Sequence, residues 1–319
     1  MGYTGPTVPS PESGNAAFWS YGYVPSLALG VIGVITFIAV AGPHLWFFVK
    51  IRGTRSVHGL LFFTAIIEAL GYGARIYTHR KPFGGMSFLI GIFLIQIALI
   101  LLTAAMYKSI QRLTKYTPEG RHMSPIRPRS MLVLFVILDV VWALMQVAGQ
   151  YYYAAAEGAE ITGAEAMFTL GMSTLIFLAG NVLQAITIII VSIFAFVIYR
   201  RSTRIINTAL ANNKDIDNYP LIHPALTQVF ITFGLFFVRL IMRIAEGAQG
   251  AYGYAATHEV FFGIFEYLLI ILILILWAAR PLKNFLPLNQ TATTNSTHED
   301  VERTAELGRN ESQVEEEKA

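Results

Sequence analysis

Residues 87–110 read SFLIGIFLIQIALILLTAAMYKSI and include one formally charged side chain, Lys108. An α-helix needs about 20 mostly apolar residues to cross a bilayer, and this stretch is long enough to do so. Similar blocks recur along the 319-residue chain, which is 55% hydrophobic and 13% charged, with a mean hydropathy of +0.54. Soluble chains are charged at about a quarter of their positions. The sequence therefore predicts an all-α, polytopic membrane protein.

Seven apolar blocks are long enough to be transmembrane helices, and they span residues 25–49, 59–77, 87–110, 131–153, 168–199, 225–248 and 258–279. We expect residues 1–24 to form a short extracellular tail and residues 25–281 a seven-helix transmembrane domain. After Pro287 the chain holds eight acidic residues against three basic ones and few apolar residues. Such a composition cannot bury enough apolar surface to fold, so residues 282–319 are predicted to be a disordered acidic cytoplasmic tail.

The basic residues predict the orientation. Fifteen lysines and arginines flank the blocks on one side, whereas the opposite loops hold only Arg80 and Lys81. Cytoplasmic loops carry the excess of basic residues, which places the N-terminus outside and the C-terminus in the cytoplasm. Three glycosylation sequons, at Asn289, Asn295 and Asn310, fall in the cytoplasmic tail and are expected to stay unused.

Charged residues inside the apolar blocks are the strongest functional signal, because each costs about 2.5–3.5 kcal/mol at the centre of a membrane helix. Lys108 is one of the basic residues that set the orientation, and Glu259 opens the seventh block; the seven others are Glu68, Arg75, Asp139, Arg239, Arg243, Glu246 and Glu266. Spacings of three, four and seven residues place several on shared helix faces. Their depth, at 1.5 Å per residue, places most of them between the bilayer centre and its outer face.

Two interpretations of these charges remain open. They hold helices together, as polar residues do in bilayers, or they line an outward-facing polar cavity for an amphipathic or charged ligand. One excess acid slightly favours a cationic amine. The candidate ligand-binding residues are Glu68, Tyr72, Arg75, Asp139, Gln146, Gln184, Arg239, Arg243, Glu246 and Glu266.

Several kinds of chemistry find no support in the sequence. It has no cysteine, and it lacks the GxxxxGK[ST], HExxH and GxSxG motifs of P-loop proteins, zinc proteases and α/β-hydrolases. The seven histidines are scattered, and we expect them to be ordinary residues near the membrane interface. The sequence thus predicts no enzyme activity, no cofactor, no metal and no nucleic-acid partner.

The spacing of the polar residues resembles the fungal lipid-translocating exporters, an RTA-like family named for resistance to aminocholesterol. Glu68-x-x-Gly71-Tyr72-x-x-Arg75 is similar to the family's E-x-x-G-Y-x-x-R motif. Further matching positions are Ala104, Ala105, Tyr107, Arg112, Asp139, Gln146, Gly149, Gly180, Gln184, Arg239, Arg243, Glu246, Gly250, His258 and Glu259. Departures from the pattern include Gly263 and Trp142, and Glu266 stands where the family usually has Asp. They mark a divergent member and leave the ligand open.

The resemblance implies a translocator of amphipathic lipids, such as sphingoid long-chain bases or related toxic lipids, in the plasma membrane or an internal membrane. In this hypothesis the carboxylates hold the amine, and the arginines set their charge state. An alternative is a seven-helix receptor or sensor that binds the same lipids without transporting them. A third hypothesis, an intramembrane lipid hydrolase, lacks the histidine-rich metal site that such enzymes use. The oligomeric state stays open.

Overall fold

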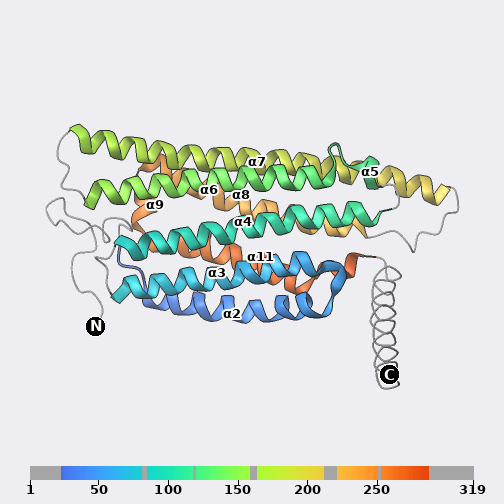
Figure 1. The fold of residues 1–319 in the computed structure, drawn as a ribbon, viewed down its shortest axis with the longest axis horizontal. Coiled ribbons are helices and arrows are strands. Elements are labelled where there is room, and N and C mark those ends of the chain that lie inside the picture. Colours follow the sequence, from blue (N-terminus) through green and yellow to red (C-terminus); the bar gives the residue numbers. More distant parts are fainter. Residues whose placement is uncertain are drawn as a thin grey trace, which may run out of the picture.

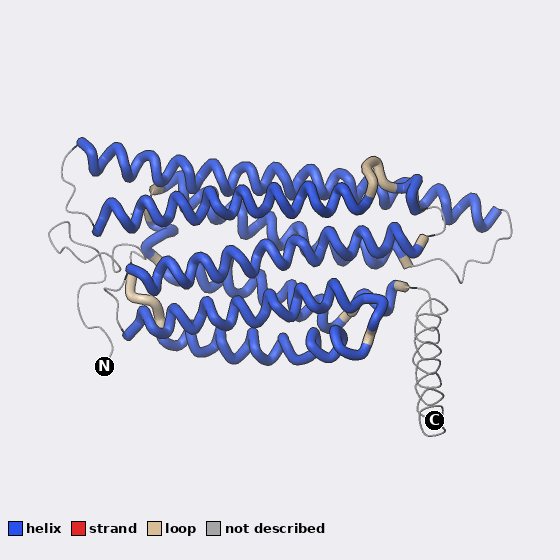
Figure 2. Tube along the Cα trace, in the orientation of Figure 1, coloured by secondary structure: helices blue, strands red, loops and turns tan. Residues whose placement is uncertain are grey.

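The computed structural model describes residues 23–80, 85–117, 120–158, 164–211, 221–250 and 253–286. Within these ranges every regular element is a helix, as Figures 1 and 2 show. Seven of the described helical segments are long and apolar enough to cross a membrane. The predicted all-α, seven-helix architecture is confirmed, while residues 1–22 and 287–319 of the predicted tails lie outside the described residues.

Each span corresponds to one predicted block. The helices are α2 (Leu27–Lys50), α3 (Arg55–Arg80), α4 (Gly85–Tyr116), α6 (Pro128–Gly158), α7 (Ala164–Ala211) and α8 (Ile222–Gln249). The seventh span consists of α10 (Glu259–Phe262), the wide-turned π-helical segment η2 (Gly263–Leu268) and α11 (Leu269–Ala279). Short connecting helices are η1 (Arg52–Thr54), α5 (Gly120–Met123), α9 (Tyr254–Thr257) and η3 (Leu282–Phe285).

The helices run along one common axis, and neighbours in the sequence pack side by side (Figure 1). α3 lies between α2 and α4, α6 packs against both α4 and α7, and α8 packs against α7. The seventh span closes the bundle by packing against α2 and α8. We call the end that carries Tyr23 the outer end and the end that carries Phe285 the inner end, after the orientation predicted from the sequence.

The surface and the core are both apolar, as expected for a helix bundle in lipid. Ile35 and Phe63 on the surface are 61% and 51% exposed, whereas Phe236 and Trp277 are buried. The indole Nε1 of Trp277 donates to Thr232 Oγ1 at 2.9 Å, which satisfies its one polar atom within the core. Buried polar groups therefore have to be paired inside the bundle, because lipid offers no alternative partner.

Two glycines bring α6 and α7 close together. A Cβ at Gly149 would lie 2.8 Å from both Phe177 N and Ser173 O on α7. From the other side, a Cβ at Gly180 would lie 2.9 Å from Gln146 Cγ. Small residues at such crossings let membrane helices approach closely. This close contact places polar side chains of α6 within reach of α7.

Candidate functional site

An ion-pair cluster joins α8 to the seventh span. Arg239 Nε donates to Glu266 Oε1 at 2.8 Å, and Arg243 Nε donates to Glu266 Oε2 at 3.0 Å. Arg243 Nη1 also donates to Glu246 Oε2 at 2.9 Å. Because α8 is a regular helix, the i, i+4, i+7 spacing of Arg239, Arg243 and Glu246 places them on one face. Both oxygens of Glu266 are thus occupied by arginines, while the side chain of Glu246 remains 27% exposed.

Glu266 lies within η2, where the helical turn widens locally. Such π-type turns are rare and are often found at functional sites. Glu259 and Glu266 lie seven residues apart in this span and have different partners: Glu266 pairs with α8, whereas Glu259 pairs with Arg75 on α3.

A second polar cluster surrounds Arg75 at the outer end. Its guanidinium donates to Glu259 Oε1 at 2.8 Å and to the Tyr23 hydroxyl at 3.1 Å. It also lies 3.9 Å from the centre of the Phe262 ring, a cation–π distance. The backbone N–H of Ser26 donates to both oxygens of Glu259 at 2.9 Å. The cluster therefore ties the start of α2 to α3 and the seventh span.

A chain of three glutamines links α4, α6 and α7. Gln96 Nε2 donates to Gln146 Oε1 at 2.5 Å, and Gln146 Nε2 donates to Gln184 Oε1 at 2.9 Å. All three side chains are buried. The close approach of α6 and α7 at Gly149 and Gly180 makes the second of these bonds possible.

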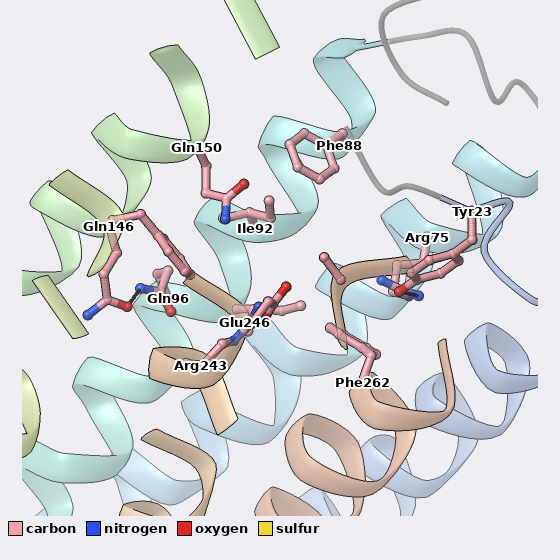
Figure 3. A pocket seen from close by; sticks show the side chains of 13 residues that line it. Tyr23, Arg75, Phe88, Ile92, Gln96, Gln146, Gln150, Arg243, Glu246 and Phe262 are labelled. Atoms are coloured by element: carbon pink, nitrogen blue, oxygen red, sulfur yellow. Dashed lines mark hydrogen bonds and ion pairs between the residues drawn. The ribbon is translucent and has the colours of Figure 1, made fainter. Parts of the chain in front are cut away.

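These clusters surround a cavity of about 70 Å³ near the outer end. Figure 3 shows Gln96, Gln146 and Gln150 on one side, Arg75, Tyr23 and Phe262 on the other, and Arg243 with Glu246 between them. The cavity is lined by Tyr23, Arg75, Phe88, Ile92, Ile95, Gln96, Gln146, Gln150, Phe177, Arg243, Glu246, Ala256 and Phe262. A smaller recess of about 30 Å³ adjoins it and is also lined by Arg243, Glu246 and Glu266. The lining thus combines charged, amide and aromatic groups in one space.

The predicted site residues fall into three groups. Arg75, Gln146, Arg243 and Glu246 line the cavity. Glu68, Tyr72, Gln184, Arg239 and Glu266 are buried and do not line this cavity, although Arg239 and Glu266 line the smaller recess. Asp139 is separate: it is fully buried and accepts a hydrogen bond of 2.9 Å from the Tyr107 hydroxyl of α4.

Glu68 and Arg75 lie seven residues apart on one stripe of α3 and have different partners. Arg75 pairs with Glu259, whereas Glu68 is buried and interacts electrostatically with Glu266 and Arg239. Glu68 Oε1 has no hydrogen-bond partner among the described residues. Beside the cavity, therefore, the carboxylate that pairs with Arg75 comes from Glu259 and not from Glu68.

Sequence reasoning missed several residues of this region. Tyr23 belongs to the predicted free tail, yet its hydroxyl accepts a hydrogen bond from Arg75. Phe88, Gln150 and Phe262 line the cavity but look like ordinary span residues in the sequence. The one available signal was Glu259, a second acid in the seventh block at a spacing of seven from Glu266.

Two histidines differ from the expectation of ordinary residues near the interface. His44 and His58 are fully buried, and their Nδ1 atoms lie 3.2 Å apart. His44 Nε2 lies 3.2 Å from the carbonyl oxygen of Leu274, so the pair links α2, α3 and α11. Across the described residues, no group of three His, Asp or Glu side chains is arranged to hold a metal ion.

Comparison with curated proteins and with solved structures finds no significant match. A family model described as "RTA1 like protein" matches residues 61–288, which covers most of the chain and all of α4, α6, α7, α8 and the seventh span. The clusters around the cavity lie mainly within this range. The chain is therefore a member of the RTA1-like protein family of seven-helix membrane proteins.

Proposed function

We propose that this protein binds and translocates amphipathic lipids, of which sphingoid long-chain bases and related toxic lipids are the best candidates. The observation that carries the proposal is the cavity near the outer end, where the half-buried Glu246 carboxylate lies among amide and aromatic side chains. An amphipathic lipid has a polar headgroup on an apolar chain. A polar cavity inside an apolar helix bundle offers an environment to both parts.

Charge supports an amine headgroup. Around the cavity, Arg75, Arg239 and Arg243 are paired with Glu246, Glu259 and Glu266. Glu68 is a fourth acid, buried close enough to influence Glu266. Carboxyl groups therefore outnumber arginines by one in this described set, and with all four ionised a protonated amine would balance the charge. Glu246 is the contact residue, since both oxygens of Glu266 already accept bonds from arginines.

The size of the cavity limits what it holds in this conformation. Ligand pockets usually begin at about 300 Å³, and this one measures about 70 Å³. It accommodates a small headgroup, while the acyl chain has to lie between helices or in the surrounding lipid. Translocation therefore requires α8 and the seventh span to separate, with the Glu266 ion pairs as the contact that has to open.

The proposal includes an orientation and a location. The N-terminus lies outside, the C-terminus is cytoplasmic, and the protein resides in the plasma membrane. The asymmetry of basic residues supports this topology. A glycan attached at Asn289, Asn295 or Asn310 would reverse it. The proposal assigns no enzymatic step, and transport is passive, ion-coupled or driven by a partner.

The test uses the purified full-length chain in liposomes and follows a fluorescent long-chain base across the bilayer, with and without a proton gradient. Glu246→Gln removes the proposed contact charge at a partly exposed site. We expect it to slow the initial rate about tenfold or more, the usual value of a charge-assisted hydrogen bond. Arg200→Gln, an exposed charge at the inner end of α7, is the matched control and should keep the wild-type rate.

Each outcome separates the hypotheses. Equal rates in Glu246→Gln and wild type would remove Glu246 from the path. No movement by the wild type, combined with thermal stabilisation by the base, would favour the receptor or sensor. Neither movement nor stabilisation would show that a long-chain base is the wrong ligand for this protein.

A further inference from the structure

A second cavity lies at the inner end, between the end of α4 and the start of α6. Its volume is about 730 Å³, within the range of about 300–1,000 Å³ that is usual for ligand sites. It is lined by Lys108, Gln111, Arg112, Thr114, Lys115, Thr117, Pro128, Arg129, Leu132 and Val133. We call it the inner cleft. Figure 1 shows α4 and α6, the two helices that supply most of this lining.

Four cations line the inner cleft, and its described lining contains no carboxylate. Lys108, Arg112 and Lys115 follow one another at spacings of four and three on α4, which places them on one face. Arg129 comes from the start of α6, and its charge acts on Lys108 together with those of Arg112 and Lys115. The four charges therefore form one cluster made by two helices.

These cations have few partners of their own. The ion pairs of the described chain involve Arg75, Arg239 and Arg243, and no described carboxylate pairs with a cation of the inner cleft. Arg112 Nη2 donates a long hydrogen bond of 3.3 Å to Ser56 Oγ, and its Nε is buried without a described partner. Like charges repel one another at this spacing. An anion in the cleft would relieve that repulsion.

One wall of the cleft is apolar and faces the surrounding lipid. Leu132 and Val133 lie on α6 one turn above Arg129, and Val133 is 47% exposed. A ligand that combines negative charge with an acyl chain fits both walls. Basic pockets between membrane helices are known to bind phosphorylated lipid headgroups in this way. A soluble anion would leave the apolar wall uncovered.

We infer that the inner cleft is a binding site for a phospholipid whose headgroup carries several phosphate groups. The headgroup lies among Lys108, Arg112, Lys115 and Arg129, and one acyl chain lies along Leu132 and Val133. Four positive charges match a headgroup of several negative charges better than a single phosphodiester. This site is separate from the outer cavity, and its ligand does not depend on which molecule the outer cavity accepts.

The test measures the dissociation constant of the purified full-length chain, in neutral detergent, for short-chain phosphatidylinositol bisphosphate. Lys115→Gln combined with Arg129→Gln removes two exposed charges of the inner cleft. At about 1 kcal/mol per basic residue, we expect affinity to fall about 30-fold. The matched control, Arg200→Gln combined with Arg204→Gln, removes two exposed charges at the inner end of α7, outside the cleft. The dissociation constant of this control should stay within about threefold of the wild-type value.

Three further results would overturn the inference. An equal loss of affinity in both double variants would mean that lipid affinity depends on the total charge of the inner end and not on the cleft. Inositol trisphosphate that binds as tightly as the lipid would identify a site for a soluble phosphate compound. The acidic C-terminal residues are another candidate occupant. If Glu315→Gln, Glu316→Gln and Glu317→Gln together tighten lipid binding in the full chain more than tenfold, the tail fills the cleft. Short-chain phosphatidylcholine is the control lipid and should not bind at the concentrations at which the bisphosphate lipid binds.

Discussion

The two ends of the bundle treat positive charge in opposite ways. At the outer end Arg75, Arg239 and Arg243 are each paired with a carboxylate at 3.0 Å or less. In the inner cleft four cations come together, and no described carboxylate pairs with them. Lipid forces the buried arginines to find partners within the protein. The inner cleft opens to the interface, where water and phosphate can serve instead.

The difference also concerns packing. At the outer end, glycines bring α6 against α7, and the cavity measures about 70 Å³. At the inner end, α4 and α6 leave a cleft of about 730 Å³. A narrow, neutralised site suits a ligand that enters by moving helices. An open, charged site suits a ligand that enters from the membrane surface.

The largest expected effect comes from breaking the outer cluster. Glu266→Gln leaves Arg239, which is 1% exposed, without its carboxylate in the core of the bundle. Removing one partner of a buried ion pair typically costs about 3–5 kcal/mol. We expect a strongly lowered thermal unfolding temperature in detergent. The control is Glu246→Gln on α8, where the glutamate side chain is 27% exposed; this variant should cost about 1 kcal/mol or less. Similar losses in both variants would mean that burial does not determine how much each ion pair contributes to stability.

A medium effect is expected at the contact between α6 and α7. Gly149→Ala places a methyl group 2.8 Å from the backbone N of Phe177, so the helices have to move apart. Overpacking of this kind costs about 1–3 kcal/mol. Gly234→Ala on α8 is the control, because its methyl group meets no described atom within 4 Å. It should be neutral or stabilise the helix by up to about 1 kcal/mol.

For Gly149→Ala and Gly234→Ala, we measure thermal unfolding and binding of the long-chain base. A tolerated Gly149→Ala would show that α6 and α7 have room to separate at the outer end. The outer site would then be less rigid than its glycine contact indicates, and the contrast with the inner cleft would weaken.

The sequence allowed the seven spans to be predicted because length and apolar composition decide membrane insertion. It also placed Arg239, Arg243 and Glu246 on one face, because α8 is a regular helix. The seventh span departs from a regular helix at the wide turn of η2. A rule for regular helices does not detect where a helix stops being regular.

Contacts between distant segments lie beyond sequence patterns. Arg75 and Glu259 are 184 residues apart, and nothing local links them. Tyr23 is another example: it follows a Gly- and Ser-rich stretch typical of a free tail, but its hydroxyl contacts Arg75. His44 and His58 were each expected to be ordinary interfacial residues. They form a buried pair because α2 and α3 are antiparallel neighbours, which brings residues on both sides of one tight connection together.

The smallest expected effect tests the inner cleft directly, and it has the opposite sign from Glu266→Gln. Lys108 feels the charges of Arg112, Lys115 and Arg129, with no described carboxylate to offset them. Lys108→Gln should therefore stabilise the protein by about 0.2–0.5 kcal/mol at low salt, the size of a relieved like-charge pair. At about 1 M salt the Debye length falls to about 3 Å, and the gain should vanish.

The control for Lys108→Gln is Lys50→Gln, at the last residue of α2, where the residues three and four positions earlier are Phe47 and Trp46. Its charge favours the helix C-terminus, so its removal should cost about 0.3–1 kcal/mol at low salt. The two variants remove the same charge from the same end of the bundle, yet thermal unfolding should move in opposite directions. If Lys108→Gln also destabilises, an acid outside the described residues pairs with the cleft, and the contrast between the two ends is wrong. If it stabilises, the inner cleft holds repulsion that a bound anion would relieve.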